Sequence, residues 1–84
     1  MYEILFTDEA KKQLARLSQE ARERIGSALE RIKLRPHNFV KRLYNSKYYR
    51  LRVDNYRVIL DIQDASLIIY VIKLGLRGEI YKTK

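Results

Sequence analysis

An alternating segment on both sides of a two-residue turn, residues 48–62, restricts the possible folds more than any other part of the chain. In its first half, apolar and polar side chains alternate: Tyr49, Leu51 and Val53 against Tyr48, Arg50 and Arg52. A period of two residues is typical of a β-strand with one buried face. Asp54 and Asn55 follow, and both residue types tolerate the positive φ angles of a type I′ turn. The segment therefore predicts a hairpin whose second strand runs from Tyr56 to Ile62.

The register of this hairpin brings three arginines together. A turn of two residues closes the strands at Val53 and Tyr56. Arg52 then lies opposite Arg57, and Arg50 projects to the same face. We expect this face to be the open side of the sheet, while the apolar face packs against helices. Like charges directly opposite each other are destabilising, in a setting where pair terms are roughly 0.2 to 1 kcal/mol. Such a conflict is expected at a functional site, where an anionic ligand relieves it; a cationic face that is merely solvated is the alternative.

Capping residues and helical spacing define the first half of the chain. Tyr2 to Phe6 is an apolar-rich strand that ends at Thr7, a candidate helix N-cap. Ser18 is a second N-cap candidate. The helix that follows it ends at or before Leu34, because Pro36 restricts the residue ahead of it. These patterns predict a strand followed by a helical hairpin.

The second half supplies most of the sheet. Leu67 to Leu74 is a nearly unbroken apolar run, typical of a central strand covered on both faces. The residues from Gly75 to Gly78 interrupt it, and Glu79 to Lys82 form a short last strand or a turn in this prediction. The order β-α-α-β-β-β predicts an α+β fold in which the helical hairpin packs on a three- to four-stranded antiparallel sheet segment. We expect residues 1–84 to form a single domain, because a chain of this length supports one core.

The basic charge is concentrated in the second half. The formal net charge is +8; residues 1–36 contain 8 basic and 6 acidic residues, whereas residues 37–84 contain 10 and 4. This excess favours a polyanionic partner such as nucleic acid. The chain has no Cys, which excludes disulfides and thiolate chemistry. No motif predicts a metal or another cofactor. No secretion signal or apolar stretch of roughly 20 residues is present, so we expect a cytoplasmic protein without a membrane partner.

Two further features favour a nucleic-acid ligand. Arg77 lies between Gly75 and Gly78, where a tight backbone leaves its guanidinium room to approach a ligand. Tyrosines accompany the basic residues: Tyr44, Tyr48, Tyr49 and Tyr81. Bases stack on such rings at roughly 1 to 3 kcal/mol each. Core burial is the expectation for three tyrosines: Tyr49, Tyr56 and Tyr70. The only histidine, His37, is expected to be a solvated loop residue.

Two segments, YRLRVDNYRVILDI (residues 49–62) and VIKLGLRGEIY (residues 71–81), together with the element order, resemble the RelE/ParE superfamily of toxin–antitoxin toxins. The resemblance covers essentially the whole chain. RelE-like toxins are small basic ribonucleases that cleave mRNA in the ribosomal A site, and a cognate antitoxin neutralises them. The resemblance implies the same activity here, with the ribosome, mRNA and a RelB-like antitoxin as partners. An acidic antitoxin with an amphipathic helix suits this basic chain.

The resemblance also implies roles for individual residues. The two arginines that act on the scissile phosphate in that family match Arg57 and Arg77. Basic residues of the second strand match Arg50 and Arg52, and a C-terminal tyrosine matches Tyr81. Further RNA contacts are expected from five residues: Lys41, Arg42, Lys47, Tyr48 and Lys82. Many relatives carry a histidine directly before the second phosphate-binding arginine, where this chain has Leu76.

These roles imply a metal-independent reaction. The 2′-hydroxyl of a nucleotide attacks its own 3′-phosphate, leaving a 2′,3′-cyclic phosphate and a free 5′-hydroxyl. Two alternatives stay open. A ParE-like poison of a topoisomerase has the same fold, and a non-catalytic RNA- or ribosome-binding module is compatible with Leu76 in place of histidine.

Overall fold

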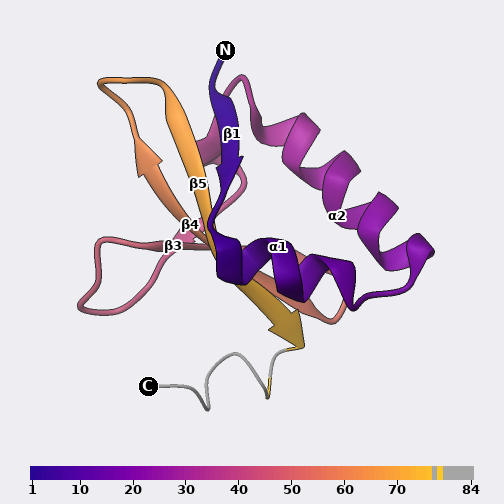
Figure 1. Cartoon of the computed structure of the whole chain (residues 1–84). Coiled ribbons are helices and arrows are strands. Elements are labelled where there is room, and N and C mark those ends of the chain that lie inside the picture. The colour runs from indigo at the N-terminus through magenta and orange to yellow at the C-terminus, as the bar shows by residue number, and fades with distance from the viewer. Residues whose placement is uncertain (77, 79–84) are drawn as a thin grey trace.

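The computed structural model describes residues 1–76 and 78, which form two helices, a short 3₁₀ helix and five strands (Figure 1). In chain order they are β1 (Glu3–Phe6), α1 (Asp8–Ala15), α2 (Gln19–Ile32), the 3₁₀ helix η1 (Pro36–Asn38), β2 (Lys41–Arg42), β3 (Tyr49–Val53), β4 (Tyr56–Gln63) and β5 (Ile68–Leu76). The strands build one sheet in the order β1-β5-β4-β3-β2. Only the β1–β5 pair is parallel. The predicted α+β fold is confirmed.

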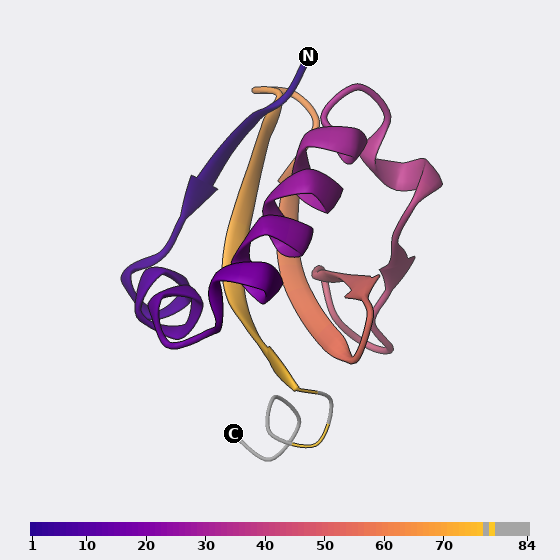
Figure 2. The same cartoon turned by 90° about the vertical axis from the view of Figure 1, so that its right-hand side faces the viewer.

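Both helices lie on the same face of the sheet (Figures 1 and 2). Their N-caps are the predicted ones: the side chains of Thr7 and Ser18 accept hydrogen bonds from the backbone N–H groups of Ala10 and Ala21. In Figure 2, α2 runs lengthwise across the sheet while α1 is seen nearly end-on beside β1. The two helices therefore follow each other through a tight connection, but their axes cross steeply. No helix among the described residues is long and apolar enough to cross a membrane.

The sheet differs from the sequence expectation at both ends of its second half. Between α2 and the predicted hairpin, where the sequence predicted no helix or strand, lie η1 and the two-residue strand β2, which pairs with the start of β3. At the other end, β5 continues through Gly75 and Leu76 instead of stopping at Leu74. Gly75 pairs with Arg57, so the ladder with β4 carries the glycine in an extended conformation. The expected last strand or turn at residues 79–82 lies outside the described residues.

The β3–β4 hairpin has the predicted register. Val53 pairs with Tyr56 across the two-residue turn. Asp54 has a φ of 53°, but Asn55 is not among the residues with positive φ. The turn therefore lacks the two left-handed residues of a type I′ turn, and this detail of the prediction is wrong. The register depends on the number of turn residues rather than on that detail, so the strand pairing is unaffected.

α1 covers the edge of β5 beyond the end of β1. The hydroxyl of Thr7 donates to the Ile72 carbonyl at 2.7 Å, and the Leu74 N–H donates to the side-chain oxygen of Gln13 at 2.7 Å. The same Thr7 oxygen accepts the N–H of Ala10 at 3.1 Å, so one side chain caps the helix and satisfies the strand. An uncovered edge exposes unpaired backbone groups, and these side chains supply hydrogen-bond partners for two of them.

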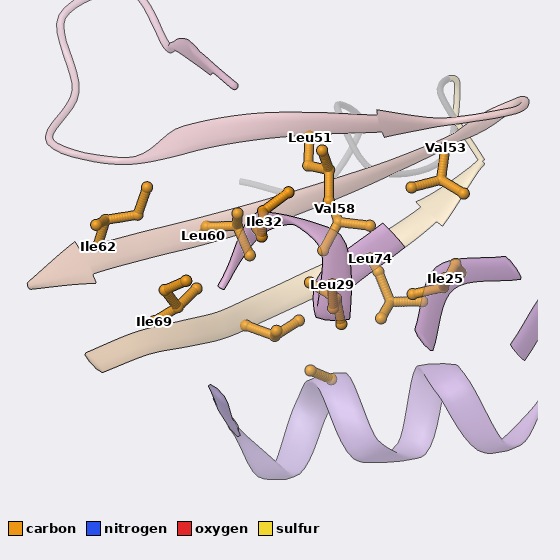
Figure 3. Packing of buried hydrophobic residues seen from close by; sticks show 12 residues of the cluster. Ile25, Leu29, Ile32, Leu51, Val53, Val58, Leu60, Ile62, Ile69 and Leu74 are labelled. Carbon is orange, nitrogen blue, oxygen red and sulfur yellow. The ribbon is translucent and has the colours of Figure 1, made fainter. Parts of the chain in front are cut away.

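The hydrophobic core lies between the helices and the sheet (Figure 3). It is built mainly by the apolar stripe of α2 and by alternate residues of β3, β4 and β5. Its members are Ala10, Ile25, Leu29, Ile32, Leu51, Val53, Val58, Leu60, Ile62, Ile69, Val71 and Leu74. All alternating apolar residues of the predicted hairpin face are among them or pack against them, including Tyr49 and Tyr56.

Truncation of Leu60 should show how far this single core supports the fold. The side chain has no exposed surface, so Leu60→Ala should lower the free energy of unfolding by about 2 to 5 kcal/mol through lost burial and the remaining cavity. Leu34 is 66% exposed, and Leu34→Ala should change the free energy of unfolding by no more than about 0.5 kcal/mol. Urea denaturation measures both, and equal losses would contradict the assignment of Leu60 to the core.

Candidate nucleic-acid interface

The face of the sheet opposite the helices carries the three arginines that the hairpin brings together. The pairing places Arg52 opposite Arg57 and Arg50 opposite Ile59, as predicted. The short strand β2 adds a fourth cation, because Lys41 pairs with Arg50 and opposed residues share a face. We call these four residues, Lys41, Arg50, Arg52 and Arg57, the cationic face. Lys41 could not be assigned to it from the sequence, because two residues are too few to show a strand period.

The cationic face is not uniformly open, and here the sequence expectation is wrong. Arg52 is exposed and Arg50 is half-buried, but Arg57 is only 3% exposed and its neighbour Ile59 only 2%. β4 is the middle strand of five, so Arg57 is flanked on both sides, by Arg52 of β3 and by Gly75 of β5. Arg57 is the only buried charged residue in the described part of the chain.

The buried guanidinium of Arg57 is incompletely satisfied. Its Nε atom is buried and has no hydrogen-bond partner among the described residues. A buried polar group without a partner costs free energy, and the cost is larger for a charged group. Burial of Arg57 in this position is thus expected to lower the stability of the fold. A bound anion would supply the missing acceptor.

Arg52 and Arg57 line one open pocket of about 500 Å³ at the tip of the hairpin. Asp54, Asn55 and Leu76 complete the lining that the structure describes. The sequence had indicated Asp54 and Asn55 only as turn residues.

The carboxylate of Asp54 would repel an anion in this pocket if it were unpaired. Arg24 of α2 forms an ion pair with it at 3.0 Å and also pairs with Glu20 at 3.3 Å. These two carboxylates raise the pKa of Arg24 above its ordinary value, Asp54 through the larger effect. Because Arg52 and Arg57 outnumber Asp54, and Arg24 offsets part of its charge, the pocket lining keeps a net positive charge. The same ion pair links the hairpin tip to α2.

Leu76 reaches the pocket at the end of β5, so the position where the family resemblance implied a histidine is close to the two arginines. Three predicted site residues, Arg77, Tyr81 and Lys82, lie outside the described residues. The positions of the remaining predicted RNA contacts follow from the β2–β3 hairpin.

Two cations of the β2–β3 hairpin lie against tyrosine rings. Arg42 pairs with Tyr49, on the helix side of the sheet, and its guanidinium lies 5.9 Å from the centre of that ring. The ammonium of Lys47 lies 5.5 Å from the centre of the Tyr48 ring. Cations at such distances are attracted to the faces of aromatic rings. Arg42 and Lys47 are therefore close to the cationic face in sequence. Among the basic residues of the β2–β3 hairpin outside β3, however, Lys41 alone shares that face by strand pairing.

His37 is exposed, as the sequence predicted, but it also takes part in a cluster of side-chain contacts. Its Nε2 lies 2.8 Å from Oδ1 of Asp64, and the hydroxyl of Tyr2 donates to the same oxygen at 2.7 Å. The imidazole also makes an edge contact with the Tyr49 ring, with centroids 5.1 Å apart. The hydrogen bond from Tyr2, and then that from His37, lower the pKa of Asp64. This cluster joins the residue before β1, the 3₁₀ helix η1 and the β4–β5 turn. No sequence spacing could have indicated it.

The described residues contain no group of three or more His, Cys, Asp or Glu side chains suited to a metal ion. The candidate site therefore consists of arginines and lysines with aromatic neighbours. Such a set can bind phosphate groups and stabilise negative charge, because guanidinium groups match phosphate oxygens in charge and geometry.

The chain matches the model of a known family, the ParE toxin of type II toxin–antitoxin systems, over residues 4–81. This protein belongs to that family. The match covers the whole described chain except its first three residues, so both predicted signature segments fall inside it. No curated protein matches the chain.

Solved structures of RelE toxins share the fold. The isolated RelE toxin of Escherichia coli is 23% identical, with a TM-score of 0.80 and coverage of 98% of this chain and 93% of that one. A RelE–RelB complex of Pyrococcus horikoshii is 25% identical, with a TM-score of 0.78 and coverage of 92% and 96%. A RelBE complex of Mycobacterium tuberculosis is 20% identical, with a TM-score of 0.80 and coverage of 90% and 98%. The toxin is thus a RelE/ParE superfamily member with a RelE-like fold.

Substituting Arg57 should separate stability from function. Arg57→Met keeps an unbranched side chain of similar length but removes the buried charge, so the free energy of unfolding should stay equal or rise, by up to about 4 kcal/mol. Arg52→Met, at the exposed partner position, should change it by no more than about 0.5 kcal/mol. Urea denaturation of the two variants checks this, and a clear loss of stability in Arg57→Met would show that the guanidinium is structural.

The Asp64 cluster predicts an acid-sensitive contribution to stability. Because its hydrogen bonds place the folded-state pKa of Asp64 below the ordinary value of 3.8, the contribution is present above that pH and is lost as the pH falls through the folded pKa. Asp64→Ala should lower stability slightly at neutral pH, since water competes at this exposed site. The native protein and the variant should converge in strong acid.

Denaturation curves recorded across this pH range measure that convergence. Glu23→Ala removes an exposed carboxylate of α2 and controls for the change in net charge. A stability difference between the native protein and Asp64→Ala that persists unchanged into strong acid would contradict the prediction.

Proposed function

We propose that this toxin is a ribosome-dependent endoribonuclease that cleaves mRNA in the A site and thereby inhibits translation. The observation that carries the proposal is the pocket in which Arg52 and Arg57 lie opposite each other, with Arg57 nearly fully buried and its Nε unpartnered. Two guanidinium groups held by neighbouring strands form a preorganised binding site for a phosphate that gains negative charge. The RelE-like fold supports the same assignment.

The proposed reaction uses a nucleophile that the substrate itself provides. The 2′-hydroxyl loses its proton and attacks the adjacent phosphorus, the P–O5′ bond breaks, and the departing 5′-oxygen takes up a proton. Arg57 and Arg77 stabilise the charge on the phosphorane oxygens, an effect that can contribute about 3 to 4 kcal/mol for each well-placed donor. Arg50 and Arg52 hold the backbone and favour ionisation of the 2′-hydroxyl. Arginines keep their protons, so their role is electrostatic.

The remaining site residues act on the RNA around the scissile phosphate. In this proposal Tyr81 orients a base or assists the leaving oxygen. The additional RNA contacts are Lys41, Arg42, Lys47, Tyr48 and Lys82. Leu76 at the pocket leaves no imidazole for proton transfer, so charge stabilisation carries more of the catalysis than in relatives with a histidine.

An antitoxin is the second partner we propose. The RelE structures of Pyrococcus horikoshii and Mycobacterium tuberculosis are complexes with their antitoxins. A net charge of +8 favours an acidic antitoxin whose amphipathic helix covers cationic and apolar surface together. We further propose that residues 1–84 act as one domain in the cytoplasm.

A second candidate activity, poisoning of a topoisomerase, is favoured by the family match, which names ParE rather than RelE. The same fold serves both classes, so the fold does not separate them. The third possibility, an RNA- or ribosome-binding module without catalysis, is favoured by Leu76. All three differ in their products, and product chemistry therefore decides among them.

Cell-free translation with primer extension on the mRNA tests the proposal. The native protein should produce cuts within translated mRNA that end in 2′,3′-cyclic phosphate. Arg57→Met, and likewise Arg57→Ala, should reduce cleavage at least about 100-fold, because a donor to the transition state is removed. Arg16→Met removes an exposed arginine at the end of α1 and should cleave like the native protein.

Three other results would redirect the assignment. Native-like cleavage by Arg57→Met would show that the pocket does not take part in the reaction. Inhibition of DNA supercoiling without mRNA cleavage would favour the topoisomerase activity. Ribosome binding with intact mRNA would favour the non-catalytic module.

A further inference from the structure

The loop between β2 and β3, residues 43–48, presents an uncovered aromatic side chain. Tyr44 is 94% exposed, the largest exposed fraction among the large apolar and aromatic side chains that the structure describes. Figure 1 shows this loop projecting from the side of the sheet away from α2, which is the side of the cationic face. The loop that carries the ring is therefore on the same side of the sheet as the cationic face, and the ring is not part of the core.

The loop is braced from within, so the ring is held out rather than left on a loose chain. The Leu43 N–H donates to the Tyr48 carbonyl at 3.0 Å and closes the base of the loop. Nε of Arg42 donates to the Ser46 carbonyl at 2.9 Å, and the Ser46 hydroxyl accepts the Tyr48 N–H at 3.0 Å. Asn45 has a φ of 54°, a left-handed conformation that asparagine tolerates. A braced loop loses less conformational entropy when a ligand binds.

The charge around Tyr44 has one sign. Between Glu30 and Asp54 the chain contains eight Lys and Arg residues and no carboxylate. In the described structure, no carboxylate pairs with Lys41, Arg42 or Lys47. A surface built to bind an apolar protein segment would surround its aromatic anchor with apolar neighbours, but Tyr44 is followed by Asn45, Ser46 and Lys47.

The two other tyrosines of this region already have a cation on their rings. Arg42 lies against Tyr49 and Lys47 against Tyr48. Both rings are also half-buried. Tyr44 is thus the ring in this hairpin with both faces accessible, and an accessible ring among cations is the combination that stacks unpaired bases.

We propose that the β2–β3 loop is a contact site for single-stranded RNA in which Tyr44 stacks on an unpaired base and Lys41 and Lys47 bind the flanking phosphates. The inference deepens the proposed function and rests on it for the identity of that RNA as the mRNA to be cleaved. β3 starts directly after the loop, so Arg50 and Arg52 follow Tyr48 at about 7 and 13 Å along the strand. One RNA strand can therefore contact the loop and the pocket together.

Binding of a non-cleavable probe tests the site independently of catalysis. The probe is a fluorescent 2′-O-methyl oligoadenylate of about ten nucleotides, within the range of single-stranded site sizes. By fluorescence anisotropy, Tyr44→Ala should weaken binding about 5- to 100-fold, the loss of one stacked base. Tyr44→Phe keeps the ring and should bind within about twofold of the native protein. Phe39→Ala removes an exposed ring outside the loop and should bind like the native protein.

Two further measurements separate stacking from charge. An abasic oligomer of the same length should bind equally to the native protein and to Tyr44→Ala, because it offers no base to stack. Lys47→Ala should lower the slope of log Kd against log salt by about one, whereas Tyr44→Ala should leave the slope unchanged.

Several outcomes would overturn the proposal. Native-like binding by Tyr44→Ala would remove the base contact, and equal weakening in Tyr44→Phe would assign the effect to the hydroxyl. Loss of antitoxin binding by Tyr44→Ala with unchanged RNA binding would make the loop a protein contact. Absence of mRNA cleavage by the native protein would refute the proposed function but would leave the binding result standing.

Discussion

The pairing of Val53 with Tyr56 across a two-residue turn is the constraint on which the rest of the structure depends. Side chains alternate between the faces of a sheet, so a slip of one residue would exchange the faces of one strand. The observed pairing sends Leu51 and Val58 into the core and Arg52 and Arg57 to the other side. Core and candidate site are thus two consequences of one register. The ion pair between Asp54 at the turn and Arg24 on α2 adds a contact that holds this tip against the helix layer.

The burial of Arg57 shows a conflict between stability and function. A domain of this size buries a modest fraction of its surface, so a buried charged residue in the middle strand is costly. Elsewhere the backbone of the sheet is well satisfied: the side chains of Thr7 and Gln13 form hydrogen bonds with backbone groups of β5 that β1 does not pair. The conflict at Arg57 is resolved when an anion accepts a hydrogen bond from its guanidinium. In the proposed function, a phosphate of the RNA is that anion. In that proposal the rigid sheet holds the guanidinium groups in place before the substrate arrives, so little reorganisation is needed.

The proposed substrate path combines elements of very different character. The pocket is formed by strand residues whose positions are determined by paired backbone, whereas Tyr44 is carried by a loop held by three hydrogen bonds. The membership in the ParE toxin family and the RelE-like fold are compatible with more than one target, because the fold provides a cationic sheet face and leaves the choice of ligand to individual side chains. Leu76 at the pocket is such a side chain. It offers no group for proton transfer beside Arg52 and Arg57.

The sequence by itself determined the features that depend on near neighbours: the two helix N-caps, the hairpin register and the pairing of Arg52 with Arg57. Each follows from local spacing or from the length of one turn, and each is confirmed. Only the tertiary structure decided that β4 is the middle strand, that Arg57 is buried, that Lys41 joins Arg50 on one face, and that His37 and Tyr2 both bond to Asp64. These depend on which distant segments lie side by side. A residue's burial is a sum over such neighbours, and the alternation of side chains along one strand reports only the face, not what covers it.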